Sequence, residues 1–433
     1  MADAPQLRRD IGRGDLVALV INVVIGAGIL GLPAVTYRAL GPYSLLAWLA
    51  CALIVGLAAA CFAEVGSRYS TTGGAYLYAC KAFGPGVGFM VGWLAWVSRL
   101  FSFATILNLA ITYAGGLSPA LSSSWARLIG IVLVSTLITV AVVVGVRRSA
   151  LINNALTAVK IALLGGFVLI GIPAIDFERF AFERTPALAD WQSALMLMSF
   201  AFIGSESAMN VSGEMRNPRR DVPFALGVGL LVIALLYLAI QAICIGTVDG
   251  LAASERPVLD AATHMLGPLG GRLLAAGALL MMLGTLFAIM LTGSRLPFAL
   301  AEQKQLPEML GRCHPRFQTP HVGIVITGVL CALLAIYTSF LGALVVTALT
   351  RLVGYITTCA ALIKLRHDDP PDARPGFVLT AGVPIAIAAL LACLWLMLAS
   401  SAAEYLMLAI LTALGALVGG GYALSCRRLS RSR

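Results

Sequence analysis

Two short glycine-containing segments interrupt apolar runs of this chain. The first, "GAGILGLP" at residues 26–33, lies in the apolar run 16–37, and the second, "FIGSES" at residues 202–207, lies in the run 191–213. Where a helix breaks, the half before the break leaves backbone carbonyls free and the half after it leaves amides free. The carbonyls can accept hydrogen bonds from an ammonium group, and the amides can donate them to a carboxylate. An α-amino acid carries both groups, so the two breaks predict an amino acid site, with helix-packing glycines or a simple proline kink as the alternative.

Five ionisable side chains fall inside apolar runs, where a charge is costly and therefore indicates a function. Lys160 can be a titrating proton carrier, a fixed cation, or a structural lysine that pairs with backbone carbonyls. Glu206, in the second break, is a candidate proton or substrate switch, or a structural acceptor for helix-end amides. Arg99 and Arg351 stay charged and need a carboxylate or a wet cavity. Because Glu64 and Glu206 are the two acids that accompany these three cations, one arginine can await the anion of a substrate. Snorkelling, a pair with Glu206 and a cytoplasmic-side gate are the other roles for the arginines.

Membrane-spanning helices are the elements that must position these groups. Hydrophobic residues make up 60% of the 433 residues, charged residues make up 12%, and the mean hydropathy is +0.93. A helix needs roughly 20 residues to cross about 30 Å of hydrocarbon, and apolar runs of that length recur along the whole chain. The run 322–363 is roughly twice that length, so it is expected to fold back near Ser339. We expect an all-α polytopic membrane protein with twelve transmembrane helices, at residues 16–37, 43–66, 85–114, 128–146, 151–172, 191–213, 222–247, 273–294, 322–340, 342–363, 377–399 and 405–425.

The distribution of charge predicts an orientation and excludes several classes of protein. Most of the 30 Lys and Arg residues fall on the same side as the N-terminus, so the positive-inside rule places both termini in the cytoplasm. We expect the protein to lie in the cytoplasmic (inner) membrane. No basic groove points to nucleic acid, no His or Cys spacing points to a metal, and no charge ring points to a channel. We expect no enzyme activity and no cofactor, with the lipid bilayer, an amino acid and protons as partners, and either a monomer or a homodimer.

Four segments resemble the amino acid/polyamine/organocation (APC) superfamily of secondary transporters. They are "VIGAGILGLPA" from residue 24, "AEVGSRYSTTGGAYLYACKAFGPGVGFMVGW" from residue 63, "FAFIGSESAMNVSGEMRNPRRDVPFAL" from residue 200 and "SRLPFALAEQKQLPEMLGRCHPRFQTPHVGI" from residue 294. The resemblance implies a five-plus-five inverted-repeat (LeuT-like) fold in which helices 1 and 6 are broken at mid-membrane. The implied parts are a cytoplasmic segment 1–15, repeats at 16–172 and 191–363, two further helices within 377–425, and a basic cytoplasmic tail 426–433.

The same resemblance implies which residues bind the substrate. Members of the superfamily bind the carboxylate on amides of the first break and the ammonium on carbonyls of both breaks. A lysine at the place of Lys160 substitutes there for the sodium ion of relatives with the same fold, and Glu206 is implied in proton coupling or conformational change. The implied substrate-binding residues are Val24, Ile25, Gly26, Ala27, Gly28, Phe200, Phe202, Ile203, Ser205, Ile289, Arg99, Thr347 and Arg351.

The sequence says less about the side chain of the substrate than about its α-carboxylate and α-ammonium groups. Thr347, Arg351 and Tyr355 share one helix face at a spacing of four residues, and this segment is similar to one in which exchangers of the superfamily recognise a side-chain carboxylate. We therefore favour acidic amino acids, carried by sodium-independent transport that is proton-coupled or exchange-type. A neutral amino acid permease or exporter is the alternative, because a mostly apolar lining from the third, sixth, eighth and tenth predicted helices would suit a neutral side chain. A basic amino acid or polyamine antiporter is the second alternative, although two arginines would repel a cation.

Overall fold

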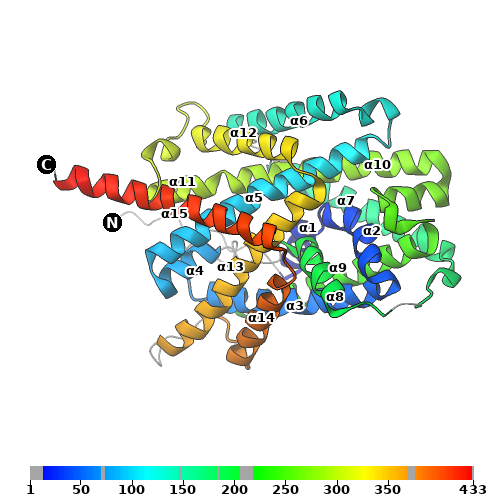
Figure 1. Ribbon diagram of the computed structural model, residues 1–433, viewed down its shortest axis with the longest axis horizontal. Helices are drawn as coiled ribbons and strands as arrows, with labels where there is room; N and C mark the ends of the chain where they lie inside the picture. The colour runs from blue at the N-terminus through cyan, green and yellow to red at the C-terminus, as the bar shows by residue number, and fades with distance from the viewer. Residues whose placement is uncertain are drawn as a thin grey trace.

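The computed structural model describes residues 13–69, 74–145, 149–182, 185–204, 218–368 and 376–431. Within these ranges the regular structure is helical, and loops and short 3₁₀ turns connect the helices (Figure 1). The helices are α1 (Arg13–Val24), α2 (Gly28–Leu40), α3 (Ser44–Gly66), α4 (Gly74–Phe83), α5 (Pro85–Ala114), α6 (Ser124–Val144), α7 (Ser149–Gly171), α8 (Leu188–Ser199), α9 (Pro218–Thr247), α10 (Pro257–Gly293), α11 (Arg295–Glu302), α12 (His321–Tyr337), α13 (Phe340–Asp368), α14 (Gly382–Met397) and α15 (Ala402–Arg431).

Many of these helices have the length and composition of membrane spans. In the part of the chain that the structure describes, seven helical stretches are long and apolar enough to cross a membrane, and three apolar helices are shorter. Their outward faces are apolar as well. On α6, Trp125, Ile129, Leu133 and Leu137 are spaced by four residues and each exposes more than half of its surface. An apolar stripe of this kind marks a surface that contacts lipid or another protein, and together with the long apolar helices it indicates a polytopic membrane protein.

The predicted turn near Ser339 is confirmed. α12 ends at Tyr337 and α13 begins at Phe340, so the long apolar run divides into two helices. The Ser339 hydroxyl accepts a hydrogen bond of 3.1 Å from the Gly342 amide, which satisfies one of the first-turn amides that a helix leaves free.

The start of α10 differs from the prediction. A helix was predicted at 273–294, but α10 begins at Pro257 and bends at Gly267, which has a φ of +69° and precedes Pro268. Asp260, His264 and Arg272 make this first part more polar than the rest of the helix. A search for long apolar runs therefore missed it.

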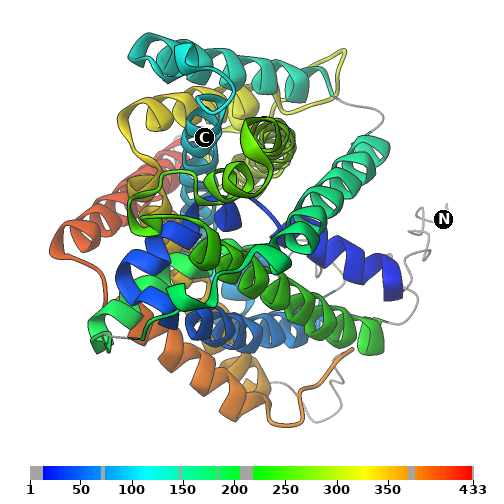
Figure 2. The same cartoon turned by 90° about the vertical axis from the view of Figure 1, so that its right-hand side faces the viewer.

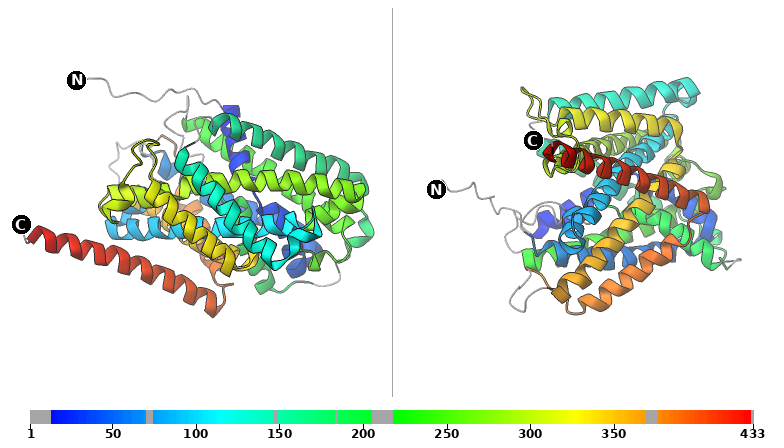
Figure 3. Two further views of the ribbon diagram at one scale, coloured as in Figure 1. Left: turned by 90° about the horizontal axis from the view of Figure 1, so that it is seen from above. Right: turned by 60° about the vertical axis from the view of Figure 1, so that its left-hand side comes forward.

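α5 is the central helix of the bundle. It crosses the bundle diagonally and packs against α13, α10, α4 and α12 (Figures 1 and 3). On one side of the bundle α12 packs against α6, and α15 lies at the edge (Figures 2 and 3). α1 and α3 both pack against α9, which brings α9 close to the break between α1 and α2.

Candidate functional site

The first predicted break is present between α1 and α2. α1 ends at Val24 and α2 begins at Gly28, so residues 25–27 are not helical. Ala27 precedes α2 and provides no side-chain cap, and among the described residues we find no hydrogen bond for the backbone amides of Ala27 and Gly28. These amides, at the positive end of the α2 dipole, are available to an anionic group.

Gly28 allows the two breaks to meet. A Cβ atom at Gly28 would lie 2.8 Å from the Cα of Ala201, so a larger residue would force the backbones apart. Ala201 belongs to the 3₁₀ turn Phe200–Phe202 that follows α8. After this turn Ile203 is extended, and Gly204 has a φ of +113°, a conformation that L side chains rarely adopt. The described part of this run therefore leaves the helical conformation within the predicted second break, in contact with the first break.

Two of the predicted residues, Ser205 and Glu206, lie outside the described residues. The described part of the second break ends at Gly204, and a Cβ atom there would lie 2.7 Å from the Cγ1 of Val23 on α1. The close approach of Gly204 to Val23 and of Gly28 to Ala201 shows that the two interrupted segments form one region.

Lys160 lies at the carbonyl end of α1. Its ammonium donates to the Asn22 carbonyl (3.3 Å) and to the Thr285 hydroxyl on α10 (3.4 Å), and the residue is only 6% exposed. The last carbonyls of a helix lack partners within the helix and carry a partial negative charge, which a nearby cation stabilises by up to about 2 kcal/mol when partly buried. The structure thus places Lys160 at the first break, where it ties α1 to α7 and α10.

The two predicted arginines lie on neighbouring helices. Arg99 is on α5, and its Cβ atom is 3.1 Å from the place that a Cβ on Gly293 of α10 would occupy. Arg351 is on α13, one turn after Thr347, and the Ser98 hydroxyl lies 3.5 Å from the Thr347 carbonyl, which brings α5 and α13 together at this level. The Thr347 hydroxyl donates its hydrogen to the Ala343 carbonyl of the same helix (2.9 Å).

Phe200, Phe202 and Ile289 are apolar and buried, at 7%, 0% and 8% exposure. The Phe202 ring packs against Trp48 on α3 and Tyr237 on α9, with ring centroids 6.0 and 5.4 Å away. The side chain of Phe202 is therefore part of the helix packing. The binding role predicted for its backbone carbonyl stays a prediction.

Comparison with known proteins assigns the chain to a family. A family model described as "Amino acid permease" matches residues 11–417. The chain belongs to the amino acid permease family. The alignment with the serine/threonine exchanger of Bacillus subtilis is 28% identical over 329 residues and covers 73% of this chain and 74% of that protein. The alignment with the methylthioribose transporter of the same organism is 26% identical over 437 residues and covers 95% of this chain and 93% of that protein. A vacuolar cationic amino acid transporter of Arabidopsis thaliana is 27% identical over 406 residues, which are 86% of this chain and 66% of that protein. These relatives are transporters, so the permease is an integral membrane transporter and not an enzyme.

Tyr237 on α9 is a site residue of the permease that the sequence analysis missed. Its hydroxyl lies 3.2 Å from the Val24 carbonyl and 3.0 Å from the Ala201 carbonyl, so one donor serves both breaks. The Val24 carbonyl, predicted to bind the substrate, thus has the Tyr237 hydroxyl as a neighbour, and its role in binding stays a prediction. Among the described residues the Ile25 carbonyl accepts no hydrogen bond, and it is the better candidate for the ammonium.

Gln241 lies one turn after Tyr237 on the same face of α9 and was also missed. Its amide nitrogen donates to the Pro33 carbonyl (3.2 Å) and the Ser44 hydroxyl (3.0 Å), and its amide oxygen accepts from the Trp48 indole (3.1 Å). This fully buried amide fixes α2 beyond the break. Two polar side chains spaced by four residues in an otherwise apolar run were the available signal.

Glu64 of the permease is committed to other partners. Arg366 donates to both of its carboxylate oxygens (2.7 and 2.6 Å), Arg68 donates to one of them (3.1 Å), and the Leu379 amide donates to the other (2.9 Å). Glu64 is fully buried. This cluster fastens the end of α3 to the end of α13 and to the segment before α14, so Glu64 holds the helices together rather than serving Arg99 or Arg351.

Proposed function

We propose that the permease is a secondary active transporter that moves amino acids across the cytoplasmic membrane by alternating access. The observation that carries this proposal is the contact between the two breaks, where the amides of Ala27 and Gly28, which bond to no described residue, lie beside the carbonyl end of α1. We propose that the substrate carboxylate binds the amides of Ala27 and Gly28 and that its ammonium binds the Ile25 carbonyl and the backbone near Ile203. The placement of breaks after α1 and α8 supports a twelve-helix, five-plus-five inverted-repeat architecture with both termini in the cytoplasm.

Lys160 is proposed to make transport independent of sodium. Its ammonium already supplies a positive charge at the carbonyl end of α1, where a bound cation would otherwise be stabilised by the helix dipole. A change in its contact with Asn22 or Thr285, by loss of the proton or by movement of α1, would alter how α1 is held. Proton coupling and exchange both fit this role, and Glu206 is proposed as a second group in the same step.

For the substrate side chain we propose a preference for acidic amino acids. Arg99 and Arg351 put two permanent positive charges on α5 and α13, and like charges in a low-dielectric site repel a cationic substrate. A small neutral amino acid is the second candidate. The relative named as a serine/threonine exchanger favours it, as do the apolar side chains of Phe200 and Ile289.

A thermal-stability screen of the purified protein tests both the proposed binding of amino acids and the proposed preference for acidic ones. A ligand present at about 100 times its Kd stabilises the folded state by about 2.7 kcal/mol, which raises the melting temperature. We expect glutamate or aspartate to raise it most, with serine and threonine as the neutral comparison. Stabilisation by lysine or arginine alone would overturn the substrate preference. If no amino acid stabilises the protein and none is taken up in liposomes, the proposed function fails.

A further inference from the structure

A cavity of about 730 Å³ opens where α2 and α5 end and α13 begins. This volume is within the range of about 300 to 1,000 Å³ that is typical of small-molecule sites. The lining residue nearest the first break is Gly31, about one helical turn beyond Gly28. There the Phe340 ring fills the space that a side chain at Gly31 would need, because a Cβ atom would lie 2.7 Å from its Cζ. Phe340 therefore packs on the lining residue of α2 that is nearest in the chain to the first break.

Two arginines on the wall of this cavity are held by neutral groups. The Arg127 guanidinium donates to the Asn108 side-chain oxygen (2.9 Å) and to the Thr338 carbonyl (3.2 Å). Arg38, near the end of α2, donates to the Ala252 carbonyl (2.7 Å). Within the described ranges neither arginine forms an ion pair. The hydrogen bonds orient both guanidinium groups and leave their charge available to an anion.

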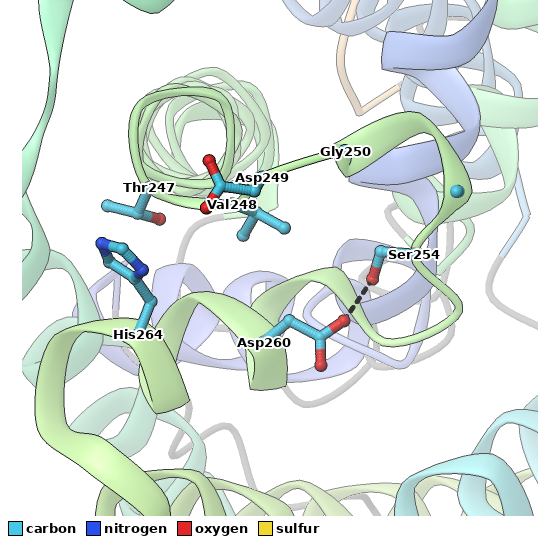
Figure 4. Close-up of a pocket in the computed structure, with 8 residues that line it drawn as sticks. Thr247, Val248, Asp249, Gly250, Ser254, Asp260 and His264 are labelled. Atoms are coloured by element: carbon cyan, nitrogen blue, oxygen red, sulfur yellow. Dashed lines mark hydrogen bonds between the residues drawn. The ribbon is translucent and has the colours of Figure 1, made fainter.

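Acidic groups also line this cavity, at the segment between α9 and α10 and at the start of α10. Glu255 and Asp260 both face the cavity. The Ser254 hydroxyl donates to one oxygen of Asp260 (2.6 Å), as Figure 4 shows, and Arg256 is 3.9 Å from the other. A smaller cavity of about 370 Å³ shares Ser254 and Asp260 with the first; its lining also includes Thr247, Asp249, Gly250 and His264 (Figure 4). Asp260 thus lies between the two cavities, with Arg256 as its charged neighbour.

We propose that this cavity is a second, outer binding site for the zwitterionic amino acid, which the ligand occupies before it passes Phe340 to the first break. The ligand carboxylate pairs with Arg127, to which Arg38 adds attractive potential, and the ligand ammonium pairs with Asp260. Charged groups of both signs in one cavity can orient a zwitterion, because each pairs with the end of opposite charge. This inference rests on the proposed function, since it concerns the route to the same central site.

Uptake into liposomes by the Arg127→Gln variant tests the outer site. We expect its KM to rise about threefold to tenfold, with a maximal rate within about twofold of wild type, and a weaker dependence of KM on salt, because a charge that attracts the ligand has been removed. Arg127→Lys should recover part of the loss, and Asp260→Asn should also raise KM. The control is Arg272→Gln, which removes an exposed arginine of α10 that lines neither cavity.

Two results separate the failure of this inference from the failure of the proposed function. If wild type transports amino acids while Arg127→Gln and Asp260→Asn keep its KM and salt dependence, the outer site is wrong and the central site stands. If wild type neither binds nor transports any amino acid, both ideas fail. A rise in KM that Arg272→Gln reproduces would also overturn the outer site, because it would reflect net charge alone.

Discussion

The ammonium of Lys160 lies 3.3 Å from the Asn22 carbonyl at the end of α1, and 3.4 Å from the Thr285 hydroxyl on α10. This arrangement joins three helices at the point where the first helix is interrupted. A movement of α1 relative to α7 would change the contact between Lys160 and Asn22. We therefore expect the hydrogen bond between Lys160 and Asn22 to depend on the position of α1 during transport.

Lys160→Met should reduce the uptake rate at least tenfold in the reconstituted protein. The substitution removes a hydrogen bond to a buried carbonyl, and a buried acceptor without a partner costs about 1 to 3 kcal/mol. We expect the melting temperature to fall as well. Lys364→Met is the matched control, because Lys364 is exposed and its ammonium lies 5.5 Å from the centre of the Phe83 ring. Uptake by Lys160→Met at the wild-type rate and with the wild-type pH dependence would argue against the role assigned here.

Gly28→Ala and Gly26→Ala form a matched pair in the same break. At Gly28 the new Cβ would be 2.8 Å from the Ala201 Cα, whereas at Gly26 its nearest neighbours would be 3.7 and 3.9 Å away. We expect Gly28→Ala to abolish the stabilisation that amino acids confer in a thermal shift assay, and Gly26→Ala to retain most of it. Equal effects of the two substitutions would show that the contact between the breaks does not shape the site.

Tyr237→Phe removes one hydroxyl and keeps the ring. Because that hydroxyl is within hydrogen-bond distance of carbonyls in both breaks, its loss should lower the free energy of unfolding by about 1 to 3 kcal/mol and reduce uptake. Tyr405→Phe on α15 is the control, since among the described residues its hydroxyl bonds to the Met397 carbonyl alone, at the edge of the bundle. Denaturation in detergent, followed for both variants, measures the difference. A Tyr237→Phe protein as stable as Tyr405→Phe would contradict the bridging role.

The sequence predicted the helices better than it predicted their connections to the site. The run 85–114 coincides with α5, because a membrane-spanning helix is defined by its own apolar residues. The glycines of residues 26–28 likewise located the first break, because a helix interruption is a local property. Tyr237 was missed because its importance comes from carbonyls on two other helices, which no local pattern records. The same holds for the role of Glu64, since its principal partner, Arg366, is distant in the chain.

Arg351→Met tests the choice of substrate. If Arg351 attracts a side-chain carboxylate, the variant should lose uptake of glutamate by about tenfold or more relative to uptake of serine, since losing a charge-assisted hydrogen bond costs about 1.5 to 3 kcal/mol. Competition between the two labelled amino acids in liposomes measures this ratio. A parallel loss for glutamate and serine would indicate that Arg351 supports the helix packing and does not select the side chain.

The most direct test of the central claim compares the preferred amino acid with its α-carboxamide and with its decarboxylated amine in a binding assay on the purified permease. If the amides of Ala27 and Gly28 hold the carboxylate, the amino acid binds and both analogues, which lack the negative charge, lose at least about tenfold in affinity. Equal affinity for the amino acid and the decarboxylated amine would contradict a carboxylate site at the break between α1 and α2.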